Sequence, residues 1–272
     1  MSARLAIPEL VAEACRLVYR QRNDLLRVGL LFTFGFFVLG VFMVDRLLPL
    51  LQELAARADA ESRELTGTQR YLPAMGLLIL VTEFLLIAVF AVGWHRVVLL
   101  GPQRAGAGLG VALGARELRF FGRMWLCLIG LLVVGFAVAQ VELTLATLLG
   151  TNLAGFLVAA SFGYLLLAAY LLGRIGPAFA ALSIDLPASF PQAWRSTAGN
   201  GFQLLAAYLL VLLGWFFLTL VVSSLSGLLG LGRAAPYALL FIGTVMTCCQ
   251  MAMLVTINAL AFRRLAGGTG PA

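Results

Sequence analysis

Glu83 is the residue best placed to do chemistry inside an apolar segment, because it lies near the middle of the run Pro73–Trp94. If that run crosses a bilayer, an ionised carboxylate there costs about 2.5–3.5 kcal/mol, so such residues usually face a bundle interior or a cavity. Two interpretations follow. Glu83 could be a proton or cation site or a polar anchor for a bound headgroup, or it could be a neutral carboxylic acid that hydrogen-bonds to a neighbouring helix.

Polar residues also recur along the last apolar run, Pro236–Phe262. Gly243, Thr247, Gln250 and Asn258 fall on one face at helical spacing. A stripe of this kind most often joins helices through hydrogen bonds, and it could instead line a polar pathway. The candidate intramembrane polar site therefore comprises Glu83, Thr247, Gln250 and Asn258.

His95, the single histidine, directly follows the run that contains Glu83. Twelve helical residues separate the two, or about 18 Å, so they cannot form a catalytic pair. We expect a structural role for His95 and a turn or helix-capping role for Asp185 beside Ser183. Interfacial positions are predicted for Trp94, His95, Arg96, Trp194 and Arg195.

No metalloprotease, phosphate-loop or Ser/His/Asp signature is present in the sequence. We therefore expect no catalytic residue, no metal site, no cofactor and no enzymatic activity. Gly155, Ala159 and Gly163 form a small-residue ridge that permits close helix packing, either within the chain or with another copy.

The composition excludes an ordinary soluble domain. Of 272 residues, 62% are hydrophobic and 11% are charged, whereas soluble domains carry about 25% charged residues. The net charge of +7 comes from arginines spread over several loops without aromatic interleaving, so nucleic acid is not an expected partner. The four cysteines do not indicate a disulfide framework.

Six apolar runs approach or exceed the roughly 20 residues that a helix needs to cross a bilayer. Strands are not expected, because the runs lack period-2 alternation and an open sheet edge is unsatisfied in lipid. The predicted fold is an all-α, polytopic integral membrane helical bundle with about six transmembrane helices plus amphipathic interfacial helices. The runs are Val28–Val44, Pro73–Trp94, Met124–Val141, Leu153–Gly173, Phe202–Val222 and Pro236–Phe262.

Arginine placement predicts the orientation. Fourteen of the 19 arginines lie before the first run, in the second and fourth loops or in the tail, and five lie on the other side. Because basic loops stay in the cytoplasm, both termini are predicted there. The expected location is the bacterial inner membrane.

Three regions are expected: an amphipathic interfacial helix in 1–27, a six-span domain in 28–264 and a flexible tail in 265–272. The helix at 7–20 could lie on the membrane surface or pack on the bundle. The first run is short and could lengthen through Leu47–Leu51. Gly176–Pro177 is predicted to break the fourth helix, after which residues 174–187 could re-enter the membrane.

Four segments carry a resemblance to a bacterial family. They are Gly93–Gly101 at the end of the second run, Arg116–Phe120 before the third, Ala181–Pro187, and Ala193–Gly201 with its Ala-Trp-Arg-Ser-Thr-Ala-Gly-Asn-Gly sequence. These are similar to the six-span proteins of the YciC family and to the membrane domain attached to some glycerophosphoryl diester phosphodiesterases. The likeness covers roughly residues 90–215. It implies an inner-membrane location, while the metal-binding acids of the phosphodiesterase barrel have no counterpart here.

The expected function is non-enzymatic: a membrane-organising, lipid-binding or accessory protein whose partners are membrane lipids, other membrane proteins or further copies of the chain. The alternative is a small transporter or channel that uses Glu83 and the polar face of the last span.

Overall fold

The chain folds as an all-helical bundle in its described residues. The computed structural model describes residues 5–58, 71–105, 113–149, 153–187, 189–230 and 235–265, and these contain helices and turns but no strand. Of the predicted tail at 265–272, Leu265 is the last residue of the final helix and residues 266–272 lie outside the described residues. Six helices are long and apolar enough to cross a membrane, which confirms the predicted fold class.

Each of the six spans is a helix that the structure describes over at least 28 residues. The first comprises α2 (Arg22–Phe42), a π-helical turn η1 (Met43–Leu47) and α3 (Leu48–Ala58). The others are α4 (Leu72–Leu100), α5 (Ala115–Leu149), α6 (Leu153–Ser183), α8 (Gly201–Leu228) and α10 (Pro236–Leu265). Two helices lie outside the spans, α1 (Ile7–Arg20) and α7 (Phe190–Ser196).

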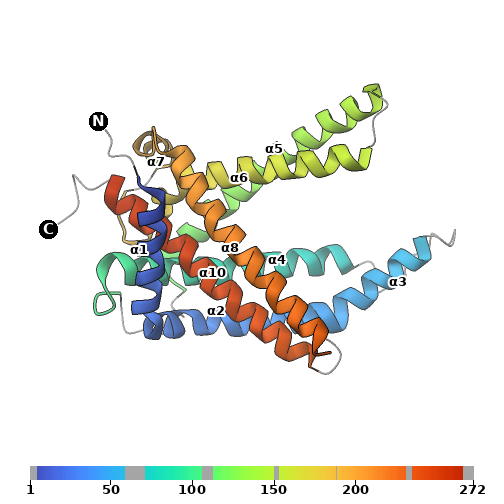
Figure 1. The fold of residues 1–272 in the computed structure, drawn as a ribbon, viewed down its shortest axis with the longest axis horizontal. Coiled ribbons are helices and arrows are strands. Elements are labelled where there is room, and N and C mark those ends of the chain that lie inside the picture. Colours follow the sequence, from blue (N-terminus) through green and yellow to red (C-terminus); the bar gives the residue numbers. More distant parts are fainter. Residues whose placement is uncertain are drawn as a thin grey trace.

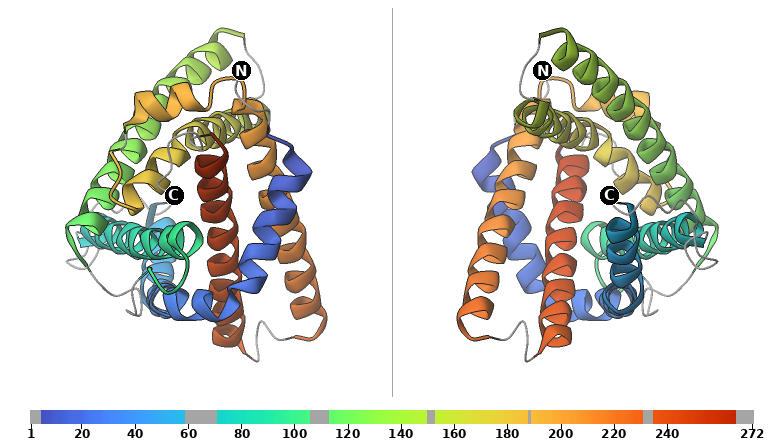
Figure 2. Two further views of the ribbon diagram at one scale, coloured as in Figure 1. Left: turned by 90° about the vertical axis from the view of Figure 1, so that its left-hand side faces the viewer. Right: turned by 90° about the vertical axis from the view of Figure 1, so that its right-hand side faces the viewer.

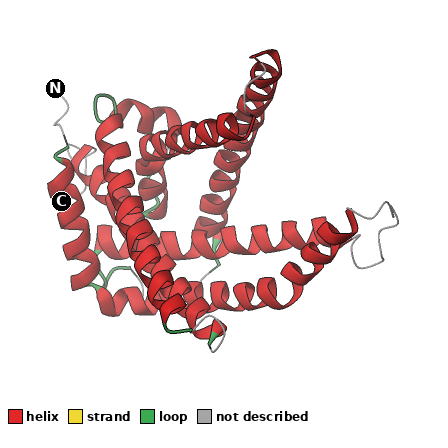
Figure 3. Cartoon of the chain, turned by 45° about the vertical axis from the view of Figure 1, so that its right-hand side comes forward, coloured by secondary structure: helices red, strands yellow, loops and turns green. Residues whose placement is uncertain are grey.

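Helices α1 and α7 and the last turns of α10 lie at one end of the bundle, which we call the proximal end (Figure 1). The opposite end, where α8 meets α10 and α2 continues into α3, is the distal end (Figure 1). Seen along the molecule, α10 lies inside the bundle, and it packs against α1, α2, α4, α6 and α8 (Figure 2). The α5–α6 hairpin diverges from α2 and α4 toward its tip (Figure 3).

The first span is longer than its apolar run. It reaches from Arg22 to Glu53 because the helix passes through Asp45 and Arg46 without a break. Both of these charged residues are exposed, and the Tyr237 hydroxyl donates to the Asp45 carboxylate at 2.9 Å. The predicted extension through Leu47–Leu51 is confirmed.

The predicted break at Gly176–Pro177 is wrong. Helix α6 continues through Pro177 to Ser183, so residues 178–183 are its last turns and no separate segment re-enters the membrane. Proline removes one backbone donor, but helices packed among neighbours tolerate this. Here Ala178, Phe179 and Ala180 are buried, and this packing keeps the helix intact.

Helix α1 packs on the bundle. Its residues Leu10 and Ala14 are fully buried in a cluster with Leu204 of α8 and Ile257 of α10. The backbone N–H of Leu5 donates to the Asn200 side chain at 2.9 Å. Of the two placements considered for this amphipathic helix, the structure therefore shows packing on the protein for its buried face.

Candidate functional site

The proximal halves of the spans are closely packed around Trp94. The Trp94 side chain is fully buried, and its indole N–H donates to the Thr256 hydroxyl at 2.9 Å and to the Ala252 carbonyl at 3.1 Å. Thr256 and Ala252 are also fully buried. This layer of buried groups joins α4 to α10.

His95 lies in the same packed region. It is 1% exposed, and its Nδ1 lies 3.3 Å from the Ser183 hydroxyl of α6. That hydroxyl donates to the Phe179 carbonyl, while His95 Nε2 has no partner among the described residues. Trp94 and His95, predicted as interfacial, therefore point into the bundle.

Arg174 occupies an aromatic cage at the end of α6. It donates to the Thr197 hydroxyl at 2.7 Å, to the Tyr170 hydroxyl at 3.0 Å and to the Trp194 carbonyl at 2.5 Å. The guanidinium carbon lies 3.9 Å from the centroid of the Trp194 ring, a cation–π contact. Trp194 is 39% exposed and Arg195 is exposed, as expected of interfacial residues.

Asp185, just beyond the end of α6, joins that end to α4 and to the first turns of α5. Its carboxylate accepts hydrogen bonds from Arg116, with the Arg116 Nε at 3.0 Å from Oδ1, and Arg96 and Arg119 lie within 3.9 Å. The hydrogen bond from Arg116 is the main reason that the pKa of Asp185 falls below its usual range. Asp185 also has a φ of 60°, which agrees with the predicted turn role. In addition to that role, its carboxylate forms the centre of an ion-pair network.

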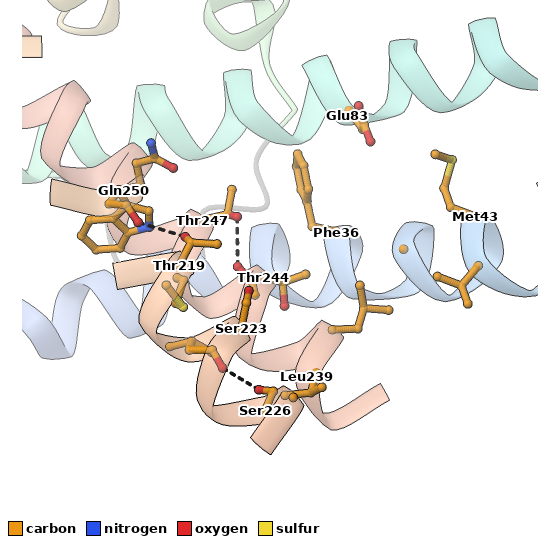
Figure 4. A pocket seen from close by; sticks show the side chains of 18 residues that line it. Phe36, Met43, Glu83, Thr219, Ser223, Ser226, Leu239, Thr244, Thr247 and Gln250 are labelled. Atoms are coloured by element: carbon orange, nitrogen blue, oxygen red, sulfur yellow. Dashed lines mark hydrogen bonds between the residues drawn. The ribbon is translucent and has the colours of Figure 1, made fainter. Parts of the chain in front are cut away.

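The distal halves of four spans line the candidate binding cavity, which is partly open to the outside of the bundle and has a volume of about 800 Å³. Glu83 of α4 points toward Phe36 of α2 across this space (Figure 4). Thr247 and Gln250 of α10 line the same cavity. Three of the four residues predicted as an intramembrane polar site therefore come together.

Asn258 does not belong to this cavity. Its side-chain oxygen accepts a hydrogen bond from the Tyr208 hydroxyl at 2.6 Å, and it packs closely on Gly176 of α6. It is two helical turns from Gln250, on the proximal side, where α6, α8 and α10 meet. Asn258 thus joins helices, which was one of the two roles considered for the stripe.

Helix α8 supplies polar groups that we did not predict. Thr219, Ser223 and Ser226 line the cavity together with Thr244 of α10. The three α8 residues are spaced i, i+4 and i+7, so they share one helical face. That spacing was present in the sequence and could have identified the wall opposite Glu83.

The walls of the cavity are otherwise apolar. Trp215 also lines it, and its indole N–H is buried without a partner among the described residues. The apolar lining comes from α2, η1, α8 and α10, through Phe36, Met43, Val44, Val222, Leu239, Leu240 and Met246.

The small-residue ridge is only partly described. The side chains of Gly155 and Ala159 lie outside the described residues. A Cβ placed on Gly163 would meet no atom within 4 Å, so Gly163 faces open space. Within the described part of the chain, no three His, Cys, Asp or Glu residues are grouped so that they could hold a metal ion.

Comparison with known proteins gives no match: no family model, no curated protein and no solved structure matches the chain. The function must therefore be inferred from the chemistry of the cavity.

Proposed function

We propose that the protein is a non-enzymatic inner-membrane protein that binds an amphiphilic lipid in the distal cavity. The observation that carries this proposal is the cavity itself, whose apolar walls and band of polar groups come from four spans. Its volume of about 800 Å³ falls within the range of small-molecule sites. Apolar walls disfavour water, whereas an acyl chain fits them.

The polar groups of the cavity would then contact the headgroup of the lipid or the first atoms of its acyl chain. Glu83, Gln250 and the hydroxyls of α8 and α10 lie on the cavity wall, where a pure hydrocarbon would leave them unpaired, at a cost. The free indole N–H of Trp215 suits a carbonyl or ether oxygen. An amphiphile satisfies both kinds of wall.

The inner-membrane location and the cytoplasmic orientation of the proximal end belong to the same proposal. They are supported by the excess of arginines in loops at that end and by the resemblance to the YciC group. The exposed apolar side chains of α5, such as Leu132 and Phe136, suit lipid or a neighbouring membrane protein.

The test is to fill the cavity. Gly243 lines it, and a Cβ added there meets no atom within 4 Å, so we expect Gly243→Leu to extend into ligand space without disturbing the fold. The measurement is the amount and identity of lipid that co-purifies after detergent washing, by mass spectrometry. We expect the retained species to be depleted in this variant.

Gly214→Leu is the matched control, because Gly214 also faces open space but does not line the cavity. It should retain lipid as the wild type does. Equal lipid retention in the wild type and both variants would contradict the proposal.

Transport is the second candidate, favoured by the one-sided form of the cavity. The cavity occupies the distal halves of the spans, while the Trp94–Thr256 layer closes the proximal half. Such an arrangement is what alternating access requires in one of its states. Proton or solute flux in proteoliposomes should then fall in Glu83→Gln, and absence of flux in both proteins would exclude transport of the solutes tested.

A further inference from the structure

Four of the five hydroxyl side chains that line the cavity among the described residues donate their protons to backbone carbonyls, and Ser223 is the exception. Thr219 donates to the Trp215 carbonyl at 2.9 Å, and Ser226 donates to the Val222 carbonyl at 2.7 Å. Thr244 donates to the Phe241 carbonyl at 2.8 Å. Thr247 likewise donates to the Gly243 carbonyl at 3.0 Å. Each acceptor lies in the same helix as its donor.

A hydroxyl has one proton and two acceptor lone pairs. Because the protons of these four side chains point to backbone carbonyls, what they can offer a ligand is oxygen lone pairs. The wall formed by α8 and α10 is therefore rich in acceptors, although Trp215 and Gln250 supply neutral N–H donors.

Glu83 adds the charge. It is the one ionisable side chain among the described residues that line the cavity, and no arginine or histidine is among them. The band of acceptors and the carboxyl group face the same space from α4, α8 and α10. Such a site favours a group with several N–H or O–H donors and a positive charge.

We infer that the ligand is an amphiphile with an ammonium headgroup, which binds with the ammonium against Glu83 and the hydroxyl oxygens of α8 and α10. This inference rests on the proposed lipid-binding function. An ammonium has three donors and no acceptor, so it matches a wall of lone pairs. The acyl chain lies against the apolar residues of α2 and η1.

The same geometry disfavours an anionic headgroup. A carboxylate or phosphate would approach Glu83 without a basic residue on the described cavity wall to compensate it. Pairing between the Glu83 carboxylate and the ammonium of the ligand also explains how both charges are held inside the membrane. Glu83 lies eleven residues from the distal end of α4, which is about 16 Å along the helix, and a lone charge at such depth is costly.

The experiment uses three spin-labelled amphiphiles that share one 18-carbon chain and differ in headgroup: a primary ammonium, a neutral amide and a carboxylate. Each is added to the full-length protein in nanodiscs of zwitterionic lipid, and the immobilised fraction is measured by electron paramagnetic resonance. For the wild type we expect the ammonium to bind about tenfold more tightly than the amide, which a charge-assisted hydrogen bond supplies. The carboxylate should bind most weakly.

Glu83→Gln should bring ammonium and amide to nearly equal affinity, while Glu83→Asp should keep the preference. Asp45→Asn is the control, because Asp45 lies at the distal end but does not line the cavity, and its preference should equal that of the wild type. Equal affinities of the ammonium and amide amphiphiles for the wild type would overturn the inference. A preference that survives in Glu83→Gln would overturn it as well.

Gly243→Leu separates this inference from the proposed function. If it reduces immobilisation of all three amphiphiles but the headgroups do not differ, the lipid site stands and the ammonium assignment fails. If it changes nothing for any amphiphile, the lipid site itself fails. Competition by soluble methylammonium, which keeps the three N–H donors, at the same concentration would overturn the requirement for an acyl chain.

Discussion

At the scale of the residue, the buried cation Arg174 shows how polar groups fasten the proximal end. Arg174 is 7% exposed, and its three hydrogen-bond partners come from α6 and from the α7 region. No carboxylate lies within 4 Å of it among the described residues. Its stability therefore depends on neutral acceptors and on the aromatic rings of Tyr170 and Trp194.

We expect Arg174→Ala to lower the free energy of unfolding by about 1–3 kcal/mol, because it leaves buried acceptors unpaired and removes the cation–π contacts. Thermal unfolding in detergent measures the effect. Arg195→Ala, at an exposed position on the neighbouring α7, is the control and should stay close to the wild type. Equal loss in both variants would argue against the cage.

Asp185 makes a prediction about pH. Its pKa lies below the usual value of 3.8, mainly because of the hydrogen bond from Arg116. A lowered pKa in the folded state stabilises the protein above the unfolded pKa, and this contribution is lost as the pH falls through the folded value. Asp185 is half-exposed, so solvent screens the pairs and the contribution is small.

Asp185→Asn isolates the charge, because asparagine tolerates the positive φ at this position. At pH 7 and low salt we expect the variant to unfold at a lower temperature than the wild type. The difference should shrink as the pH is lowered below 3.8 and when salt is added. A difference that grows on acidification would show that the pairing does not stabilise the fold.

At the scale of the element, apolar length predicted the six spans well, since a run of about 20 apolar residues has few alternatives to a transmembrane helix. Local breaking signals were less dependable. Gly176–Pro177 indicates a break by its backbone chemistry, yet α6 passes through it. The reason lies in contacts that the sequence does not display, because Gly176 is the point where the Asn258 side chain approaches α6.

That contact can be tested with Gly176→Ala. A Cβ at this position would lie 2.0 Å from the Asn258 Oδ1, so Asn258 would have to move and its hydrogen bond with Tyr208 would be strained. We expect a loss of about 1–3 kcal/mol in unfolding free energy, as for other overpacked sites. Gly163→Ala on the same helix faces open space and should be neutral or slightly stabilising. A neutral Gly176→Ala would show that α6 and α10 can separate at no cost.

At the scale of the whole molecule, the two halves of the bundle differ. The proximal half contains the buried polar contacts of Trp94, His95 and Arg174, and the distal half contains the cavity. The sequence predicted that Glu83 and part of the last span would meet, because polar groups in apolar helices seek one another. It could not predict which spans would separate to form a cavity, since that depends on how helices cross.

The difference in charge between the two ends of the molecule also predicts which end faces the cytoplasm. The arginine distribution favours a cytoplasmic proximal end. Cys15 of α1 is exposed there, and Leu229, just beyond the distal end of α8, is 69% exposed. A membrane-impermeant maleimide is added to intact spheroplasts that carry one of two proteins. It should label the double variant Leu229→Cys, Cys15→Ser. In the wild-type protein, Cys15 should stay unlabelled until the membrane is permeabilised.

The opposite labelling pattern would place the cavity on the cytoplasmic side and would contradict the arginine argument. The orientation matters for the ligand, because a cavity in the distal halves of the spans draws its amphiphile from the leaflet at that end. If the proximal end faces the cytoplasm of an inner-membrane protein, our proposal predicts that the lipid enters from the outer leaflet and that the Trp94–Thr256 layer separates it from the cytoplasmic side. Thr256→Cys, buried in that layer, should remain unlabelled from either side, whereas labelling from the cytoplasm would show that the layer opens.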